Sequence, residues 1–223
     1  MDEGILLINK KQGQHSFNLV SILRRLSGIR KIGHAGTLDP FATGVMVLLI
    51  GKDYTRRSND FLNHNKAYEA TLKLGETTDS YDCDGVITSS SPLIPENCDI
   101  ETVIASFQGT TLQVPPMFSA KKIQGKRLYL LARQGIEVER APVSVTMQIE
   151  ILSYTYPYLS IRVACSKGTY IRSLAYDIGQ KLGCGAHLVG LHRIESGPFH
   201  IDKCVDAHLL ETPLFDYKAH LIA

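Results

Sequence analysis

The sequence predicts an α+β fold, and three observations lead to this prediction. Stretches with the two-residue alternation of strands are mixed along the chain with stretches that carry the apolar stripe of an amphipathic helix. The two kinds do not alternate strictly, which disfavours a doubly wound parallel sheet. No segment repeats another, and 44% hydrophobic with 21% charged residues is ordinary for a globular chain of 223 residues.

The first third of the chain is predicted to contain two strands, two helices and one ordered loop. Ser16 is a good N-cap for a helix whose leucines share one face and which ends at Gly28. Residues 33–43 are rich in Gly, Asp and Pro, which indicates a loop. The other predicted elements are a short strand at 4–9, a buried strand at 45–50 and a helix at 53–62.

The rest of the chain continues this mixture of strands and helices. Residues 66–74 alternate, with Tyr68 at the start of the apolar face. Residues 170–182 carry a helical apolar stripe, and Arg172 lies beside it. The other predicted elements are a Ser/Pro connection at 88–95, a helix from 99 to 107, an extended piece at 114–119, a helix at 128–134, and strands at 143–152 and 159–165.

Composition excludes several classes of protein. The longest apolar run is residues 45–50, far below the roughly 18 residues that span a bilayer, and the N-terminus lacks a signal-peptide pattern. The five cysteines are odd in number and widely spaced, without C-x-x-C, so we expect a reducing cytoplasm. Cys184, His187 and His192 lack a fourth ligand at sensible spacing, so we expect no metal site.

Charge is segregated along the chain although the net charge is only +2. Residues 4–38 contain six basic residues and no acid, and residues 75–120 contain seven acids and no Lys or Arg. Five further basic residues follow within 121–133. This pattern favours a basic face for a polyanion, although solvated surface charge explains it too.

Three residues are candidates for chemistry, and each has a plainer interpretation. Asp39 lies in a shaped loop before Pro40, but Asp-Pro turns are common. Arg172 can hold a neighbouring carboxylate ionised, or be a surface residue of an amphipathic helix. The ring of Tyr68 can stack on a base, or pack in the core.

Taken in order, the motifs of this chain resemble the TruB family of pseudouridine synthases from about residue 4 to residue 199. GHAGTLDPFATG at 33–44 is similar to the family's catalytic loop. The other similar segments are GILLINK at 4–10, KAYEAT at 66–71, GETTDSYDCDG at 75–85, VPPMFSAK at 114–121, GKRLY at 125–129, LARQG at 131–135, CSKGTYIRSLA at 165–175 and GCGAH at 183–187.

The resemblance implies a pseudouridine synthase fold, with a mixed, mostly antiparallel central sheet flanked by helices and loops. It implies isomerisation of uridine to pseudouridine at position 55 in the T loop of tRNA, without a cofactor. Asp39 is then the catalytic aspartate, acting as a nucleophile or through proton removal from the sugar. Tyr68 is the active-site tyrosine, and Arg172 the arginine paired with Asp39.

The resemblance also implies four RNA-binding residues. Tyr170 and Leu191 line the pocket, His34 supports the displaced nucleotide near the flipped base, and Lys10 is a basic residue beside the site. The chain departs from the family where Lys11 replaces a usual proline, and at two further positions. These are Phe118, where Tyr is frequent, and His192, where Arg is common.

We expect residues 1–199 to form the catalytic domain and residues 200–223 a short tail without the PUA-type domain of many relatives. We expect a monomer with no obligatory protein partner, which binds the T arm of tRNA. Two alternatives are a pseudouridine synthase acting on another RNA and a non-catalytic RNA-binding or RNA-folding protein.

Overall fold

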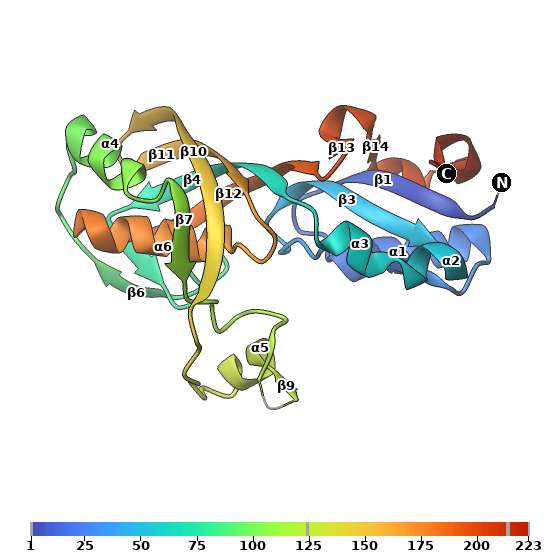
Figure 1. The fold of residues 1–223 in the computed structure, drawn as a ribbon, viewed down its shortest axis with the longest axis horizontal. Helices are drawn as coiled ribbons and strands as arrows, with labels where there is room; N and C mark the ends of the chain where they lie inside the picture. The colour runs from blue at the N-terminus through green and yellow to red at the C-terminus, as the bar shows by residue number, and fades with distance from the viewer. Residues whose placement is uncertain (1, 124, 213–214, 223) are drawn as a thin grey trace. The chain divides into compact units, whose positions relative to one another are not determined.

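The computed structural model describes residues 2–123, 125–212 and 215–222. The chain forms two compact units, which can be followed by colour in Figure 1. The first unit consists of Met1–Glu69 and Leu191–Ala223, and the second of Ala70–Gly190. The chain leaves the first unit within strand β4 and returns to it within strand β12.

The first unit contains a sheet with helices beside it. Its elements are β1 (Gly4–Lys10), α1 (Ser16–Ser27), β2 (Ile32–His34), β3 (Thr43–Ile50), α2 (Lys52–Arg56), α3 (Ser58–Leu62), the start of β4 (Lys66–Leu74), the end of β12 (Ala186–Ser196), β13 (Phe199–His200) and β14 (Val205–Asp206). The strand order is β14-β1-β3-β12, and β2 pairs with β3. β1 and β3 are antiparallel from Gly4 opposite Ile50 to Lys10 opposite Gly44, whereas β12 and β14 add in parallel.

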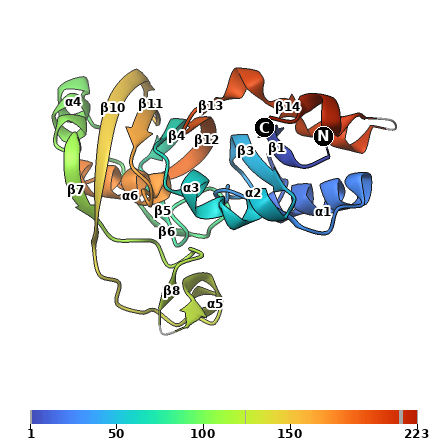
Figure 2. The same cartoon turned by 45° about the vertical axis from the view of Figure 1, so that its right-hand side comes forward.

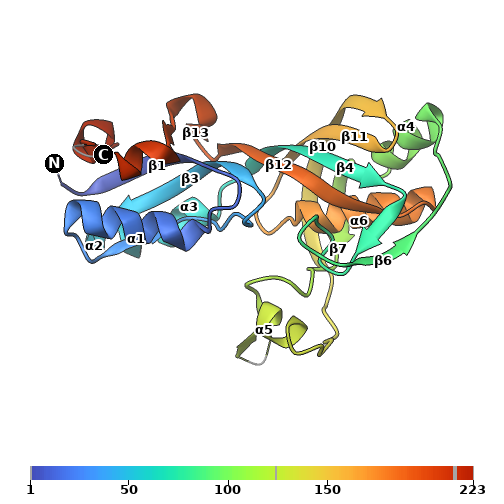
Figure 3. The ribbon, with the colours of Figure 1, turned by 180° about the vertical axis from the view of Figure 1, so that it is seen from behind.

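The core of the first unit lies on both faces of β3. Residues 45–50 are all fully buried, which agrees with their unbroken apolar sequence. Helix α1 buries Leu19, Val20 and Leu23 and packs against β2. Figure 3 shows α1 and α2 lying along β1 and β3.

The last part of the chain belongs to this unit. The amide of Ile5 donates to the carbonyl of Ile222 at 2.8 Å, and the amide of Ile222 donates back to Ile5 at 2.9 Å. Three short 3-10 helices precede this contact, at Ile201–Lys203, Ala207–Glu211 and Tyr217–His220. The predicted boundary at residue 199 therefore falls within a unit whose C-terminal residues pack on β1.

The second unit combines a large sheet with three helices and two small hairpins. Its elements are β5 (Glu76–Thr78), β6 (Ile87–Ser90), α4 (Asn97–Ala105), β7 (Gly109–Gln113), β8 (Lys122–Ile123), β9 (Lys126–Arg127), α5 (Leu128–Ala132), β10 (Val143–Thr155), β11 (Tyr158–Cys165) and α6 (Ile171–Leu182), with the end of β4 and the start of β12. The strand order is β12-β4-β11-β10-β7. Figure 2 shows the β8–β9 hairpin and α5 projecting from the rest of this unit as a small lobe.

Helix α6 is held in place by an apolar stripe and a close approach of the backbone. Its buried face contains Ile171, Leu174, Ala175, Ile178 and Leu182, as the helical spacing predicts. A Cβ atom at Gly179 would lie 2.1 Å from the backbone nitrogen of Ala186. Only glycine fits there, and this brings the start of β12 directly against the helix.

The predicted fold class is confirmed, since the sheets are mixed and the helices do not alternate with the strands. Several predicted elements differ in detail. The helix predicted at 53–62 is two short helices that meet at Arg57, and the connection predicted at 88–95 begins with strand β6. Strand β12 was not predicted, because its histidines, glycine and arginine hide the alternation. Among the described residues, no helix is long and apolar enough to cross a membrane.

One carboxyl group of α6 gives a test of this packing. Burial raises the pKa of Asp177 to about 6, and Lys181 offsets part of that rise. The folded state disfavours the charged form, so this group's contribution to stability falls as the pH rises from about 4 to about 6. Asp177→Asn should raise the free energy of unfolding by about 1 kcal/mol at pH 7, a figure discounted for partial exposure.

The gain should be smaller at pH 5, because more of the native carboxyl is then protonated. Urea unfolding at both pH values measures it, with the exposed Glu139→Gln as the control variant. A gain that is equal at pH 5 and pH 7 would contradict burial as the cause.

Candidate active site

The predicted catalytic loop connects β2 to β3 and is fixed on both sides of Asp39. The hydroxyl of Ser16 accepts from the amide of Leu38 at 3.0 Å and donates to its carbonyl at 2.9 Å. The amide of Gly13 donates to the carbonyl of Pro40 at 2.8 Å. Leu38 is buried and Asp39 half-buried, so the backbone is anchored while the carboxylate stays partly accessible.

Lys10 also holds this loop, through hydrogen bonds to backbone carbonyls. Its side chain is fully buried, and its ammonium group donates to the carbonyls of Lys11, Gln14 and Pro40 at 2.9, 2.8 and 3.1 Å. Burial lowers the pKa of Lys10 to about 8, and the charge of Asp39 acts in the opposite direction. Lys10 was expected among the RNA-binding residues, but its buried ammonium group bonds the backbone beside Asp39 and does not face the surface.

His34 ends β2, just before the catalytic loop. Burial lowers the pKa of its imidazole, and the positive charge of Arg193 lowers it further. The ring is therefore neutral at pH 7. No described residue bonds its buried Nδ1 atom.

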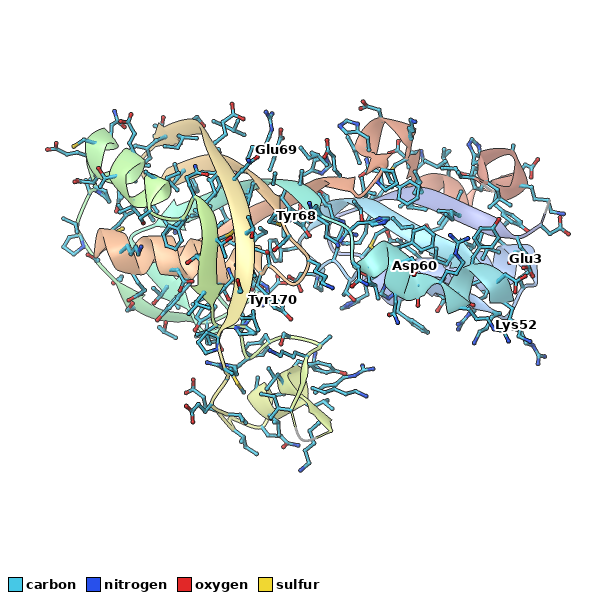
Figure 4. The ribbon with its side chains drawn as sticks, viewed as in Figure 1. Glu3, Lys52, Asp60, Tyr68, Glu69 and Tyr170 are labelled. Atoms are coloured by element: carbon cyan, nitrogen blue, oxygen red, sulfur yellow. The ribbon has the colours of Figure 1, made fainter. Side chains whose placement is uncertain are left out.

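Tyr68 and Leu191 complete the predicted residues of the first unit. Tyr68 lies in β4 with 7% of its surface exposed (Figure 4). Leu191 is half-buried in β12, and its carbonyl accepts from the hydroxyl of Thr43, the first residue of β3. Of the five predicted residues in this unit, Asp39 lies in the loop between β2 and β3, His34 directly precedes that loop, and Lys10 bonds its backbone.

Arg172 lies in the second unit, at the start of α6, and is buried. Its guanidinium donates to the carbonyls of Ser80 and Phe118 at 3.0 and 2.8 Å. Its Nη1 atom lies 3.4 Å from a carboxylate oxygen of Asp82, and both side chains are 7% exposed. Arg172 therefore binds the acidic segment around residue 82 to the segment 114–119.

Tyr170 precedes Arg172 and is held through its backbone. Its amide donates to the side chain of Gln113 at 2.8 Å, and Gln113 donates to its carbonyl at 3.1 Å. Its side chain is half-buried at the N-terminus of α6 (Figure 4). The predicted site residues thus lie in both units, five in the first and two in the second, and the pairing of Arg172 with Asp39 stays a prediction.

The small lobe of the second unit carries exposed basic side chains. Lys122, Lys126, Arg127 and Arg133 are all exposed on or beside β8, β9 and α5. The guanidinium of Arg133 lies 5.6 Å from the ring centre of Tyr129. Basic and aromatic side chains together suit a nucleic-acid backbone and its bases.

Two buried charged residues were missed by sequence reasoning. Asp82 was counted only as part of an acidic run, although GETTDSYDCDG was among the motifs. Arg193 was not singled out, because one arginine in an irregular apolar stretch carries no spacing signal.

Among the described residues, no group of three or more His, Cys, Asp or Glu side chains could hold a metal ion.

Removing Asp82 tests how far the buried ion pair stabilises the second unit. Asp82→Ala deletes a partner of Arg172, together with the acceptor for the hydroxyl of Ser80 and the amide of Asp84. The free energy of unfolding should fall by about 2–3 kcal/mol, since buried polar groups lose their partners. Urea unfolding measures it, and the exposed neighbour Asp84→Ala serves as the control. A loss no larger than that of the control would contradict this role.

Comparisons with known proteins show which family the chain resembles along its length. Residues 24–171 match the N-terminal domain model of TruB family pseudouridylate synthases, and residues 172–221 match the model of the tRNA pseudouridylate synthase B C-terminal domain. The chain is 59% identical to tRNA pseudouridine synthase B of Protochlamydia amoebophila, over 94% of this chain and 80% of that protein. It is 53% identical to tRNA pseudouridine synthase B of Chlamydia trachomatis, over 98% of this chain and 91% of that protein.

The fold is also similar to solved structures. A chain in a crystal structure of a Cbf5–Nop10–Gar1 complex superposes with a TM-score of 0.72 and 29% identity, over 93% of this chain. A chain in an H/ACA RNP bound to a substrate RNA gives a TM-score of 0.70 and 25% identity. This chain spans about half the length of those two proteins, 54% and 56%.

Proposed function

The chain belongs to the TruB family of pseudouridylate synthases, and we propose that it isomerises uridine 55 in the T loop of tRNA to pseudouridine. The observation that carries the proposal is the anchored loop that presents Asp39, which has buried backbone contacts on both sides of the aspartate. The relatives that share most of this chain are named tRNA pseudouridine synthase B, which supports tRNA as the substrate.

The reaction is an isomerisation, so its atoms and electrons balance without an oxidant or a reductant. The bond between the sugar C1′ and the base N1 breaks, the uracil turns, and a C1′–C5 bond forms. The proton on C5 is released and N1 gains a proton. Asp39 acts at the sugar, either by attacking C1′ or by removing the C2′ proton, and both routes use a carboxylate oxygen as the reacting atom.

Each of the other predicted residues has a task in this reaction. A base within a folded loop must leave its stack, at a cost of a few kcal/mol, before its glycosidic bond is accessible. Tyr68 would stack on the flipped base, Tyr170 and Leu191 would line its pocket, and neutral His34 would support the nucleotide next to it. Arg172 would orient Asp39, with Asp82 holding the guanidinium in place.

Exposed basic side chains of the lobe around α5 would hold the phosphates of the T arm.

We take a monomer in the cytoplasm as the working form, since one chain contains every residue of the proposed reaction. Two alternatives, activity on another RNA and binding without catalysis, are outcomes of the tests below.

The first test measures the reaction itself. Unmodified tRNA transcript with tritium at uridine C5 should release tritium to solvent with the wild-type protein, because the C1′–C5 bond replaces the C5 hydrogen. Asp39→Asn should lower this release by at least about 1,000-fold while tRNA affinity changes little, since the carboxamide keeps the shape but lacks charge and basicity.

A second transcript with cytidine at position 55 is the control and should give no release above background. Near-normal release by Asp39→Asn would contradict the assigned mechanism. Binding of tRNA without any release by the wild-type protein would favour the non-catalytic alternative, and release from ribosomal RNA alone would favour another substrate.

The second test concerns the basic lobe. Combined replacement of Lys122, Lys126 and Arg127 by Gln should weaken tRNA binding and flatten its dependence on salt by about 0.7–0.9 per lost phosphate contact. The rate at saturating enzyme should change little. Filter binding from 50 to 300 mM salt measures the slope, and Lys52→Gln with Lys203→Gln, both exposed in the first unit, is the control. An unchanged slope would remove the lobe from the binding surface.

A further inference from the structure

Arg193 is the largest fully buried side chain of the described protein, with 1% of its surface exposed. Burying a guanidinium is costly unless its donors are bonded and its charge is compensated. The proposed reaction gives Arg193 no contact with the base or the sugar. Its burial therefore needs another reason, and the neighbours of its guanidinium supply one.

The guanidinium joins the start of the catalytic loop to the strand that follows it. Its Nε atom donates to the carbonyl of Val45 at 2.7 Å, and its Nη2 atom donates to the carbonyl of Gly36 at 3.2 Å. Nη2 also lies 3.3 Å from the sulfur of Met46. Asp39 lies between these two carbonyls along the chain, so one planar group fixes the backbone before it and after it.

Two glycines allow Arg193 to lie close to the backbone of the loop and of β3. Gly44 stands opposite Arg193 in the β3–β12 pair and has a φ of +104°. A Cβ atom there would lie 2.2 Å from the carbonyl oxygen of Arg193. Gly36 has a φ of +95°, and a Cβ atom on it would meet the guanidinium at 3.4 Å. The family-like motif GHAGTLDPFATG thus has glycines where the loop meets Arg193.

The charge of Arg193 also reaches the other residues of the loop. It lowers the pKa of Lys10 and of His34, so its guanidinium lies within electrostatic range of both. Lys10 holds a third carbonyl, that of Pro40. Unlike a lysine, an arginine keeps its proton at every working pH and has donors in a fixed planar fork.

We infer that Arg193 is a positioning residue for the reaction: it clamps the carbonyls of Gly36 and Val45 and so holds the loop that presents Asp39. The inference rests on the proposed function. A merely structural core residue would change folding or RNA binding together with turnover. A positioning residue changes the rate on bound RNA, since a displacement of about 1 Å at a reacting group can cost about 100-fold.

The test compares Arg193→Met and Arg193→Lys with the wild-type chain. Met keeps much of the volume but removes every donor, whereas Lys keeps the charge but cannot bond both carbonyls in one plane. Single-turnover tritium release from C5-labelled tRNA at saturating enzyme gives the rate on bound RNA. Filter binding gives the Kd, and thermal unfolding gives the folded fraction at the assay temperature. Glu195→Gln, exposed two residues along the same strand, is the matched control.

Arg193→Met should lower the single-turnover rate by about 100-fold, and Arg193→Lys by about 10-fold, with Kd within about threefold of the wild type. NMR of the His34 ring gives an independent readout. Its titration midpoint should move upward in the Met variant, where the neighbouring charge is lost, and stay near the wild-type value in the Lys variant.

Wild-type turnover in either folded variant, or a rate loss matched by an equal loss of binding or of folded protein, would overturn the inference. If Arg193→Met does not fold, Arg193→Lys decides by the same criteria. In each of these outcomes the wild-type protein is still active, so the proposed function is unaffected. Absence of release by the wild-type protein would instead overturn the proposed function.

Discussion

The backbone of the loop between β2 and β3 is the constraint on which the first unit depends. The loop has no regular secondary structure, yet the carbonyls of Gly36 and Pro40, and that of Val45 just inside β3, lie against the interior, where each must find a donor. Lys10 and Arg193 supply those donors from two different strands. Both cations are buried, so their bonds hold the backbone on either side of Asp39 in a region shielded from solvent.

This arrangement has an electrostatic cost that the carboxylate itself offsets. Lys10 and Arg193 are like charges in the same buried region, and the charge of Arg193 lowers the pKa of Lys10. The charge of Asp39 acts in the opposite direction on Lys10. The negative charge of Asp39 therefore favours the protonated form of the lysine that holds its loop.

Much of this structure follows from local sequence rules, and what does not depends on contacts between distant segments. The stripe of α6, the buried run of β3 and the loop around Asp39 were each predicted, because periodicity and turn residues are local signals. The split of α2 from α3, and the existence of β12, depend on tertiary packing that no window of sequence records.

The site shows the same division. Asp39 and Arg172 were predicted as site residues because their motifs resemble a family, while the residue that pairs with Arg172 was not singled out. Asp82 pairs with it across ninety residues, and that distance leaves no signal in one sequence. Lys10 was found and its surroundings were not: a basic residue beside a site suggests a phosphate ligand, and only its complete burial shows that its bonds go to the loop.

Lys and Arg side chains occur in two environments in this protein, exposed on the lobe around α5 and buried behind the loop that presents Asp39. Exposed Lys and Arg side chains of the lobe around α5 meet the solvent, so salt screens their attraction to phosphates over about 8–10 Å. Lys10 and Arg193 are shielded from the solvent, so ions barely weaken their bonds to the loop. RNA capture should therefore respond strongly to salt while the rate on captured RNA does not. A protein that places its cations in these two environments can adjust affinity by surface substitution without disturbing the loop that presents Asp39.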